Sequence, residues 1–235
     1  MKNYDSSLDA TNPAARVPVV MLLDCSYSMH DEPIAELNSG VNRFFAEVRN
    51  DDAAAMSADI AVVTFNTTAN VAHGFASALD YPDVLDPFEA DGLTATGPAL
   101  ELAERLLAER EAEYCKAGIP HYKPWCICLT DGVPCPNKGW RRPAQRFRDK
   151  AASGDLTYLV VGVGDSINEK ILAELSAEEP GVKRLQDLRF SEFFVWLSQS
   201  MHDISVAGTA NQDDVRLRGI SSWARFAKPG KGGAR

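Results

Sequence analysis

The stretch VPVVMLLDCSYS, residues 17–28, joins a continuous apolar run to a series of short polar side chains. An apolar run without alternation, here 17–23, is typical of a strand that is buried on both faces in a parallel sheet. The run ends at Asp24, and Ser26 and Ser28 follow at alternate positions. Alternate residues of an extended chain point the same way. The stretch therefore predicts a central strand with a polar site at its carboxyl end.

Similar apolar runs alternate with helical patterns along the rest of the chain. Strands are expected at 59–65, 69–75, 125–129, 156–163 and 182–185, and helices at 33–49, 98–113, 142–152, 168–175 and 190–204. The short turn at 66–68 makes 69–75 a returning strand at an edge. The order predicts a three-layer α/β/α, Rossmann-like domain whose mostly parallel central sheet has one antiparallel edge strand.

The chain length of 235 residues suits one such domain. We expect a flexible lead-in at 1–16, the domain at 17–205 and a basic tail at 206–235. The tail contains six Lys and Arg residues and no Asp or Glu from position 215 onward, whereas the whole chain has a net charge of −9. An acidic protein is a poor match for nucleic acid as its main partner.

Composition also bears on location. No apolar run reaches the roughly 18–20 residues that a membrane span needs, and residues 1–16 lack the apolar core of a secretory signal. The five cysteines, an odd number, suit free thiols in a reducing compartment. Cys126 and Cys128 are predicted to be buried structural thiols, because zinc sites prefer wider cysteine spacings. We therefore expect a cytoplasmic protein without a membrane partner.

Oxygen-bearing side chains follow two of the buried strands and one helix-leading loop. Asp24, Ser26 and Ser28 follow the first strand, Asp131 follows the strand at 125–129, and Thr94 precedes the helix at 98–113. Ligands of open α/β sheets bind beyond the carboxyl ends of the strands. Oxygen ligands suit Mg²⁺, Mn²⁺ or Ca²⁺ rather than zinc. Since the hydroxyl ligands add no negative charge to that of the two carboxylates, such an ion would accept another carboxylate from outside, which makes this a binding site rather than a catalytic one.

These residues resemble a known constellation. Asp24-x-Ser26-x-Ser28, Thr94 in G-x-T-x-x-G and Asp131 in L-T-D-G are similar to the metal-ion-dependent adhesion site (MIDAS) of von Willebrand factor A (VWA) domains, and the likeness covers residues 17–205. It implies a divalent ion held by these five residues. The serines and the threonine would bind the ion directly or through water, and the aspartates mostly through water. It further implies a partner protein that supplies a Glu or Asp carboxylate to the ion.

The later stretches VVGVGD, 160–165, and LRFSEFFVWLSQS, 188–200, are similar to the TerY-like group of bacterial tellurium-resistance proteins. That likeness implies a bacterial stress-response setting, with a phosphatase or kinase of the same gene cluster as a candidate partner. The chain departs from many relatives at Tyr27, which stands where they have Gly. Tyr27, Thr96 and Gly132 are predicted to form the rim that a partner contacts, and Thr96 offers an alternative hydroxyl to Thr94.

Two other functions stay open on the sequence. An Asp at a strand end also begins Mg²⁺-dependent phosphohydrolases, but those enzymes need a second Asp, and this chain has Ser26 there. The other alternative is a scaffold that acts through the basic tail and its residues Trp223 and Phe226. The sequence shows no G-x-S-x-G nucleophile elbow, and the main prediction is a metal-dependent binding module that is not an enzyme.

Overall fold

The computed structural model describes residues 8–9, 11–163, 168–177, 183–185, 190–207 and 224–226. Its strands are β1 (Val17–Asp24), β2 (Ala58–Phe65), β3 (Ala69–Ser77), β4 (Trp125–Thr130), β5 (Thr157–Gly162), β6 (Lys183–Leu185) and β7 (Ala224–Phe226). Its helices are α1 (Glu32–Arg49), α2 (Asp52–Ser57), α3 (Thr96–Ala117), α4 (Arg141–Ala152), α5 (Glu169–Leu175) and α6 (Phe190–Ala207), with 3-10 turns η1 (Tyr27–Met29) and η2 (Pro136–Lys138).

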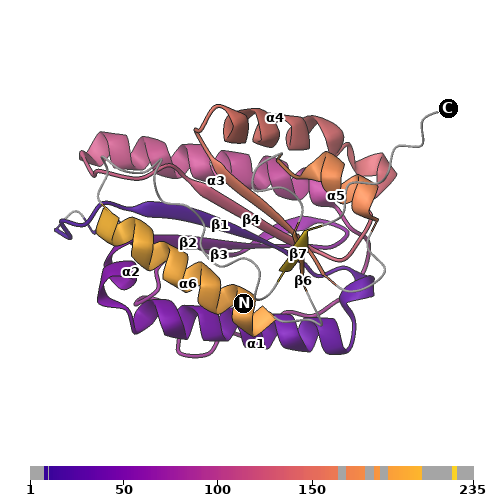
Figure 1. The fold of residues 1–235 in the computed structure, drawn as a ribbon, viewed down its shortest axis with the longest axis horizontal. Coiled ribbons are helices and arrows are strands. Elements are labelled where there is room, and N and C mark those ends of the chain that lie inside the picture. Colours follow the sequence, from indigo (N-terminus) through magenta and orange to yellow (C-terminus); the bar gives the residue numbers. More distant parts are fainter. Residues whose placement is uncertain are drawn as a thin grey trace.

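The strands form one sheet in the order β3-β2-β1-β4-β5-β6-β7 (Figure 1). β1, β2, β4, β5 and β6 are parallel, and β3 runs antiparallel to β2 at one edge, as predicted. At the other edge β7 pairs antiparallel with β6, and the sequence did not predict this strand. The register places Leu23 of β1 beside Leu129 of β4. The carboxyl ends of these two central strands therefore lie side by side.

Helices cover both faces of the sheet, which confirms the predicted three layers (Figure 1). Along β1, Val19, Met21 and Leu23 belong to the apolar core shared with α1 and α6. The intervening residues Val20 and Leu22 belong to the core shared with α3 and α4. The continuous apolar run of β1 is thus explained by helices on both sides, because both side-chain directions enter a core.

A close contact between α1 and α6 fixes one of these layers. A Cβ atom placed on Gly40 would lie 2.6 Å from the Phe194 ring and 2.9 Å from the Cβ of Phe190. Only glycine allows the two helices to approach this closely.

The sequence did not predict α2 and β7, and each omission has a physical reason. α2 has six residues, begins at an Asp51 cap that accepts from the Ala54 N–H, and is too short for an apolar period. β7 has three residues and depends on β6 for its pairing. None of the helices in the described ranges is both long and apolar enough to cross a bilayer.

Candidate metal centre

Three loops meet at the carboxyl ends of β1 and β4, and backbone hydrogen bonds hold them together. The Tyr27 N–H donates to the Gly92 carbonyl at 3.1 Å, and the Asp91 N–H donates to the Cys25 carbonyl at 2.9 Å. The Cys135 N–H donates to the Thr94 carbonyl at 2.9 Å. The loops after β1, before α3 and after β4 are therefore fixed relative to one another, and these loops carry all five predicted metal ligands.

Asp24 is completely buried, and both of its carboxylate oxygens accept hydrogen bonds. The Ser26 N–H donates to Asp24 Oδ1 at 2.9 Å, and the Thr130 hydroxyl donates to Asp24 Oδ2 at 2.5 Å. These donors are neutral. The carboxylate is therefore oriented, but no cation of the described residues compensates its charge.

The two serines connect Asp24 to Asp131. Ser26 Oγ and Ser28 Oγ are 3.1 Å apart, and the Ser28 hydroxyl donates to Asp131 Oδ1 at 2.7 Å. Their side chains share one side of the loop, as the alternate spacing predicted.

Thr94 completes the group from the loop before α3. A Cβ atom placed on Gly132 would lie 2.9 Å from Thr94 Oγ1 and 3.5 Å from Asp24 Oδ2. Thr94 Oγ1 and Asp24 Oδ2 thus border the same small space, which the missing side chain of Gly132 keeps open. The structure brings together all five residues that the sequence singled out.

Electrostatics favour a cation at this place. Burial raises the pKa of the Asp24 carboxyl to about 6, the hydrogen bonds from Ser26 and Thr130 oppose that rise, and the charge of Asp131 adds to it. Burial also raises the pKa of Asp131, against the lowering effect of the Ser28 hydroxyl. Within the described part of the chain, neither carboxylate forms an ion pair with Lys or Arg. A divalent cation would supply the missing positive charge.

The donor set fits a small, hard ion. Neighbouring oxygens of an octahedral Mg²⁺ site lie about 3 Å apart when each is about 2.1 Å from the ion, and the Ser26 and Ser28 hydroxyl oxygens match that separation at 3.1 Å. A search of the described residues for three or more clustered His, Cys, Asp or Glu side chains finds no metal-binding group. The predicted site has only two such side chains and otherwise consists of hydroxyl groups.

The predicted rim needs one correction. Tyr27 is exposed and Gly132 is partly exposed beside the site, but Thr96 is completely buried at the first residue of α3. A residue without exposed surface cannot contact a partner, so Thr96 does not belong to the rim. The sequence pattern misassigned it because it did not show where α3 begins.

Thr130 is the site residue that sequence reasoning missed. It is completely buried, and its hydroxyl accepts from the Gly132 N–H at 3.2 Å while it donates to Asp24. The register between β1 and β4 puts it next to Asp24. Its place in L-T-D-G was visible in the sequence, but the cross-strand hydrogen bond was not.

Two of the cysteines lie in the core beneath this metal centre. Cys126 and Cys128 are buried in the core under α3 and α4, and burial raises the pKa of both thiols. All five cysteines are free, which agrees with the prediction for Cys126 and Cys128 of buried structural thiols.

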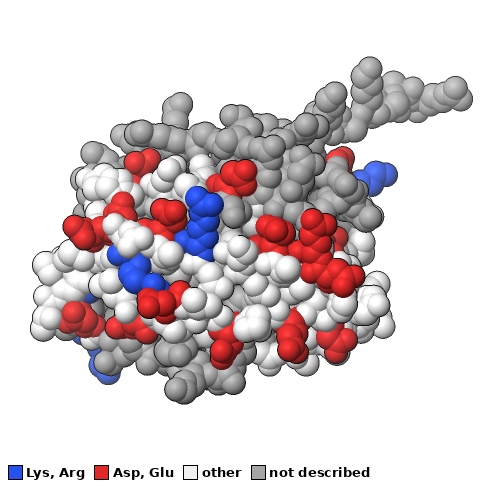
Figure 2. Space-filling model, turned by 90° about the horizontal axis from the view of Figure 1, so that it is seen from below, with Lys and Arg blue, Asp and Glu red and all other residues white. Residues whose placement is uncertain are grey.

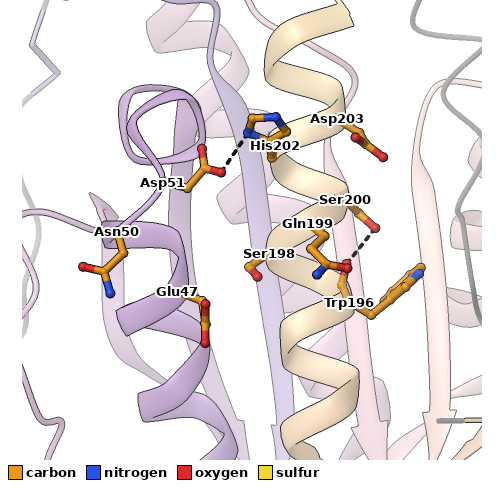
Figure 3. A pocket seen from close by; sticks show the side chains of 9 residues that line it. All are labelled: Glu47, Asn50, Asp51, Trp196, Ser198, Gln199, Ser200, His202 and Asp203. Carbon is orange, nitrogen blue, oxygen red and sulfur yellow. Dashed lines mark hydrogen bonds and ion pairs between the residues drawn. The ribbon is translucent and has the colours of Figure 1, made fainter. Parts of the chain in front are cut away.

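A second hollow lies at the opposite end of the sheet, between α1, α2 and α6 (Figure 3). Its volume is about 440 Å³, and it is lined by Glu47, Asn50, Asp51, Trp196, Ser198, Gln199, Ser200, His202 and Asp203. His202 Nδ1 lies 2.7 Å from Asp51 Oδ2. Burial acts to raise the pKa of Asp51, but the Ala54 N–H and His202 lower it overall. No sequence pattern predicted this hollow, since its lining comes from elements far apart in the chain.

Comparison with known proteins identifies the family. The family model of the von Willebrand factor type A domain matches residues 19–195. The chain belongs to this family. A comparison with functionally curated proteins found no match.

Solved VWA structures superpose on the chain at low sequence identity. The von Willebrand factor type A protein from Catenulispora acidiphila has a TM-score of 0.61 and 19% identity, with coverage of 80% of this chain and 43% of that one. Proximal thread matrix protein 1 from the mussel byssus, with a zinc-occupied MIDAS motif, has a TM-score of 0.57 and 16% identity over 82% of this chain and 48% of that one.

The vWF domain of the pilus tip protein Mfa5 from Porphyromonas gingivalis has a TM-score of 0.60 and 11% identity, and the match covers 80% of this chain and 95% of that one. The chain spans less than half the length of the first two proteins. These likenesses establish the VWA fold.

Proposed function

We propose that this VWA domain is a divalent-metal-dependent protein-binding module that acts in the cytoplasm and is not an enzyme. Asp24, Ser26, Ser28, Thr94 and Asp131 hold the ion, with Mg²⁺ as the favoured species and Mn²⁺ or Ca²⁺ as alternatives. The bound ion then accepts a Glu or Asp carboxylate from a partner protein.

The observation that carries this proposal is the buried, uncompensated Asp24. An isolated buried charge is costly unless it is paired or binds a metal. Among the described residues, Asp24 has neutral donors and a second carboxylate nearby, and no cation. The hydroxyl groups of Ser26, Ser28 and Thr94 lie close to these carboxylates, so a cation would fit among them. Two carboxylates balance a divalent ion, and a partner carboxylate can complete its coordination.

The same contacts favour binding over catalysis. An aspartyl-phosphate enzyme needs a second Asp two residues after the first, and Ser26 stands at that position. Both oxygens of Asp24 accept hydrogen bonds from buried neighbours, which orient the carboxylate. This arrangement supports a positioning role for Asp24 rather than the aspartyl-phosphate chemistry of a phosphohydrolase.

The test is metal titration of the stripped protein followed by thermal and calorimetric measurement. Mg²⁺ at about 100 times its dissociation constant should stabilise the fold by about 2.7 kcal/mol. Thr94→Ala and Ser28→Ala should remove this gain. Ser153→Ala, which removes an exposed hydroxyl at the end of α4, should keep it. If millimolar Mg²⁺, Mn²⁺ and Ca²⁺ all leave the parent protein unchanged, the proposed metal site is wrong.

The setting of the module is proposed from the TerY-like stretches of the sequence. It would serve a bacterial stress response, with a phosphatase or kinase as partner. The native protein should then retain that partner during purification in Mg²⁺ and release it in EDTA, and cell fractionation should find both in the cytoplasm. Loss of the partner on Ser28→Ala, with retention on Ser153→Ala, would tie the interaction to the metal. A native protein that carries no partner while its metal site is intact would refute this setting.

A further inference from the structure

Three exposed apolar residues lie on the loops that carry the proposed metal site. Tyr27 is 69% exposed, Leu93 is 54% exposed and Val133 is 50% exposed. Each comes from a different one of the three loops that carry the metal ligands. Large apolar side chains in that position leave hydrocarbon surface facing water next to a polar site, and such surface marks an interaction site when it is clustered.

Backbone contacts place the three residues around the same centre. Tyr27 is bonded through its N–H to Gly92, which directly precedes Leu93. Thr94, which directly follows Leu93, borders the space at Gly132, and Gly132 directly precedes Val133. Tyr27, Leu93 and Val133 therefore form a collar around the ligand hydroxyls. We call these three residues the apolar collar.

Two contacts restrict parts of the collar before any partner arrives. The ring of Tyr27 stacks on His30, with ring centroids 5.8 Å apart. The Thr67 hydroxyl accepts from the Leu93 N–H at 3.2 Å, which fixes the backbone at Leu93. Preorganised groups lose little conformational freedom on binding, so a larger share of the contact energy appears as affinity.

The charge around the collar limits what can bind. Asp31 and Asp91 are exposed on the same loops, and segments 25–31, 91–95 and 131–135 contain no Lys or Arg. The adjacent face, where α1 lies, is acidic as well, because Asp and Glu predominate over Lys and Arg among its described residues in Figure 2. A run of acidic residues in a partner would be repelled. A single carboxylate could reach the ion.

We infer that the partner presents one carboxylate between apolar side chains, and that the collar binds those apolar neighbours while the ion binds the carboxylate. This inference rests on the proposed function and adds the chemistry of the partner. It assigns binding roles to Leu93 and Val133, which the sequence did not single out, and makes Tyr27 an apolar contact.

The test compares two monocarboxylates with the same charged group, acetate and 3-phenylpropionate. Each is titrated into the Mg²⁺-loaded protein and followed by NMR through the backbone amides of Gly92 and Gly132, which are present in the parent and in every variant. Burial of about two methylene equivalents corresponds to roughly tenfold tighter binding, so 3-phenylpropionate should bind about tenfold more tightly than acetate. EDTA should abolish both interactions.

Matched variants test whether the tighter binding of 3-phenylpropionate depends on the collar. The double variant Leu93→Ser/Val133→Ser should bind both acids with similar affinity. Leu79→Ser, which changes a side chain that is 59% exposed but lies outside the three loops, should keep the tenfold preference. If the parent protein binds both acids with equal affinity, and both need the metal, the binding role of the collar is wrong. The proposed function would still stand in that case. Tighter binding of 3-phenylpropionate that survives the double variant or EDTA would also overturn the collar. The absence of metal-dependent binding of either acid would overturn the proposed function itself.

Discussion

Asp24 and Asp59 are buried at opposite ends of two neighbouring strands, and the protein compensates their charges differently. Asp59, near the start of β2, accepts from Arg110 Nε at 2.6 Å and from the Tyr114 hydroxyl. Burial acts to lower the pKa of Arg110, yet the contact with Asp59 raises it overall, which keeps the guanidinium charged. Asp24, at the end of β1, accepts from neutral donors of Ser26 and Thr130, and no Lys or Arg of the described residues pairs with it.

The difference separates a structural acid from a binding acid. Asp59 is paired with Arg110 of α3, so its negative charge is balanced within the chain. Asp24 has a second carboxylate in place of a cation, so its end is completed by something from outside. The contrast predicts that changes at the two ends will respond differently to metal.

The largest loss of stability is expected at the start of β2, where Asp59 is paired with Arg110. Arg110→Met would leave Asp59 buried without its cation, and losing one partner of a buried ion pair costs about 3–5 kcal/mol. Denaturant unfolding should show this loss equally with and without Mg²⁺. The double variant Asp59→Asn/Arg110→Met should recover part of it. A loss below about 1 kcal/mol for the single variant would contradict the structural role of the pair.

The next largest effect is expected at the end of β1, in the response of Asp24→Asn to metal. Asp24→Asn keeps the shape and removes a buried charge that has no cation, so the metal-free protein should change by less than about 1 kcal/mol. The variant should lose the whole metal-dependent gain, about 2.7 kcal/mol at 100 times the dissociation constant. Thermal melts with and without Mg²⁺ measure both quantities. Asp59→Asn is the converse control, because it should lower stability and leave the metal response intact. If Asp24→Asn still responds to metal, the ion binds elsewhere.

A smaller effect is expected from the neutral donor to Asp24. Thr130→Val removes the hydroxyl that orients Oδ2, and leaving a buried acceptor unsatisfied costs about 1–3 kcal/mol. The metal-free protein should therefore unfold at lower denaturant concentration, and bound Mg²⁺ should weaken. Thr64→Val, on the neighbouring strand β2, is the matched control and should change both quantities little. Unchanged metal affinity in Thr130→Val would show that Thr130 does not position Asp24.

The smallest effect concerns a third aspartate, which is exposed and serves neither end. Asp31 has a φ of 67°, a backbone conformation that favours glycine. Asp31→Gly should relieve this strain and raise the free energy of unfolding by about 1 kcal/mol. Asp31→Ala keeps the strained backbone and loses the carboxylate, so it should give no gain. Equal stabilisation by both variants would assign the effect to charge rather than to the backbone.

The sequence predicted the features that depend on local pattern. Residues 17–23 marked β1 because both side-chain directions are apolar, and the alternate spacing of Asp24, Ser26 and Ser28 placed their side chains on one side. The sequence could not predict contacts between distant segments. The Thr130–Asp24 hydrogen bond joins residues 106 positions apart, and it exists only because β4 pairs with β1.

The same limit explains the misassigned rim. Thr94 and Thr96 are equivalent in composition and nearly so in spacing, yet one borders the metal space and the other is completely buried at the start of α3. The apolar collar escaped for a similar reason. Leu93 and Val133 look like ordinary core residues in the sequence, and only the fold shows that they face solvent.

The pairing of β7 with β6 has a consequence for self-association. A sheet edge with unpaired N–H and C=O groups is a template on which another copy can add a strand. Ala224–Phe226 occupy the outer side of β6, so β7 forms that edge of the sheet in place of β6. A chain shortened to residue 205 would present β6 as the edge. Such a fragment would offer different backbone N–H and C=O groups to a second copy, although every predicted metal ligand is retained.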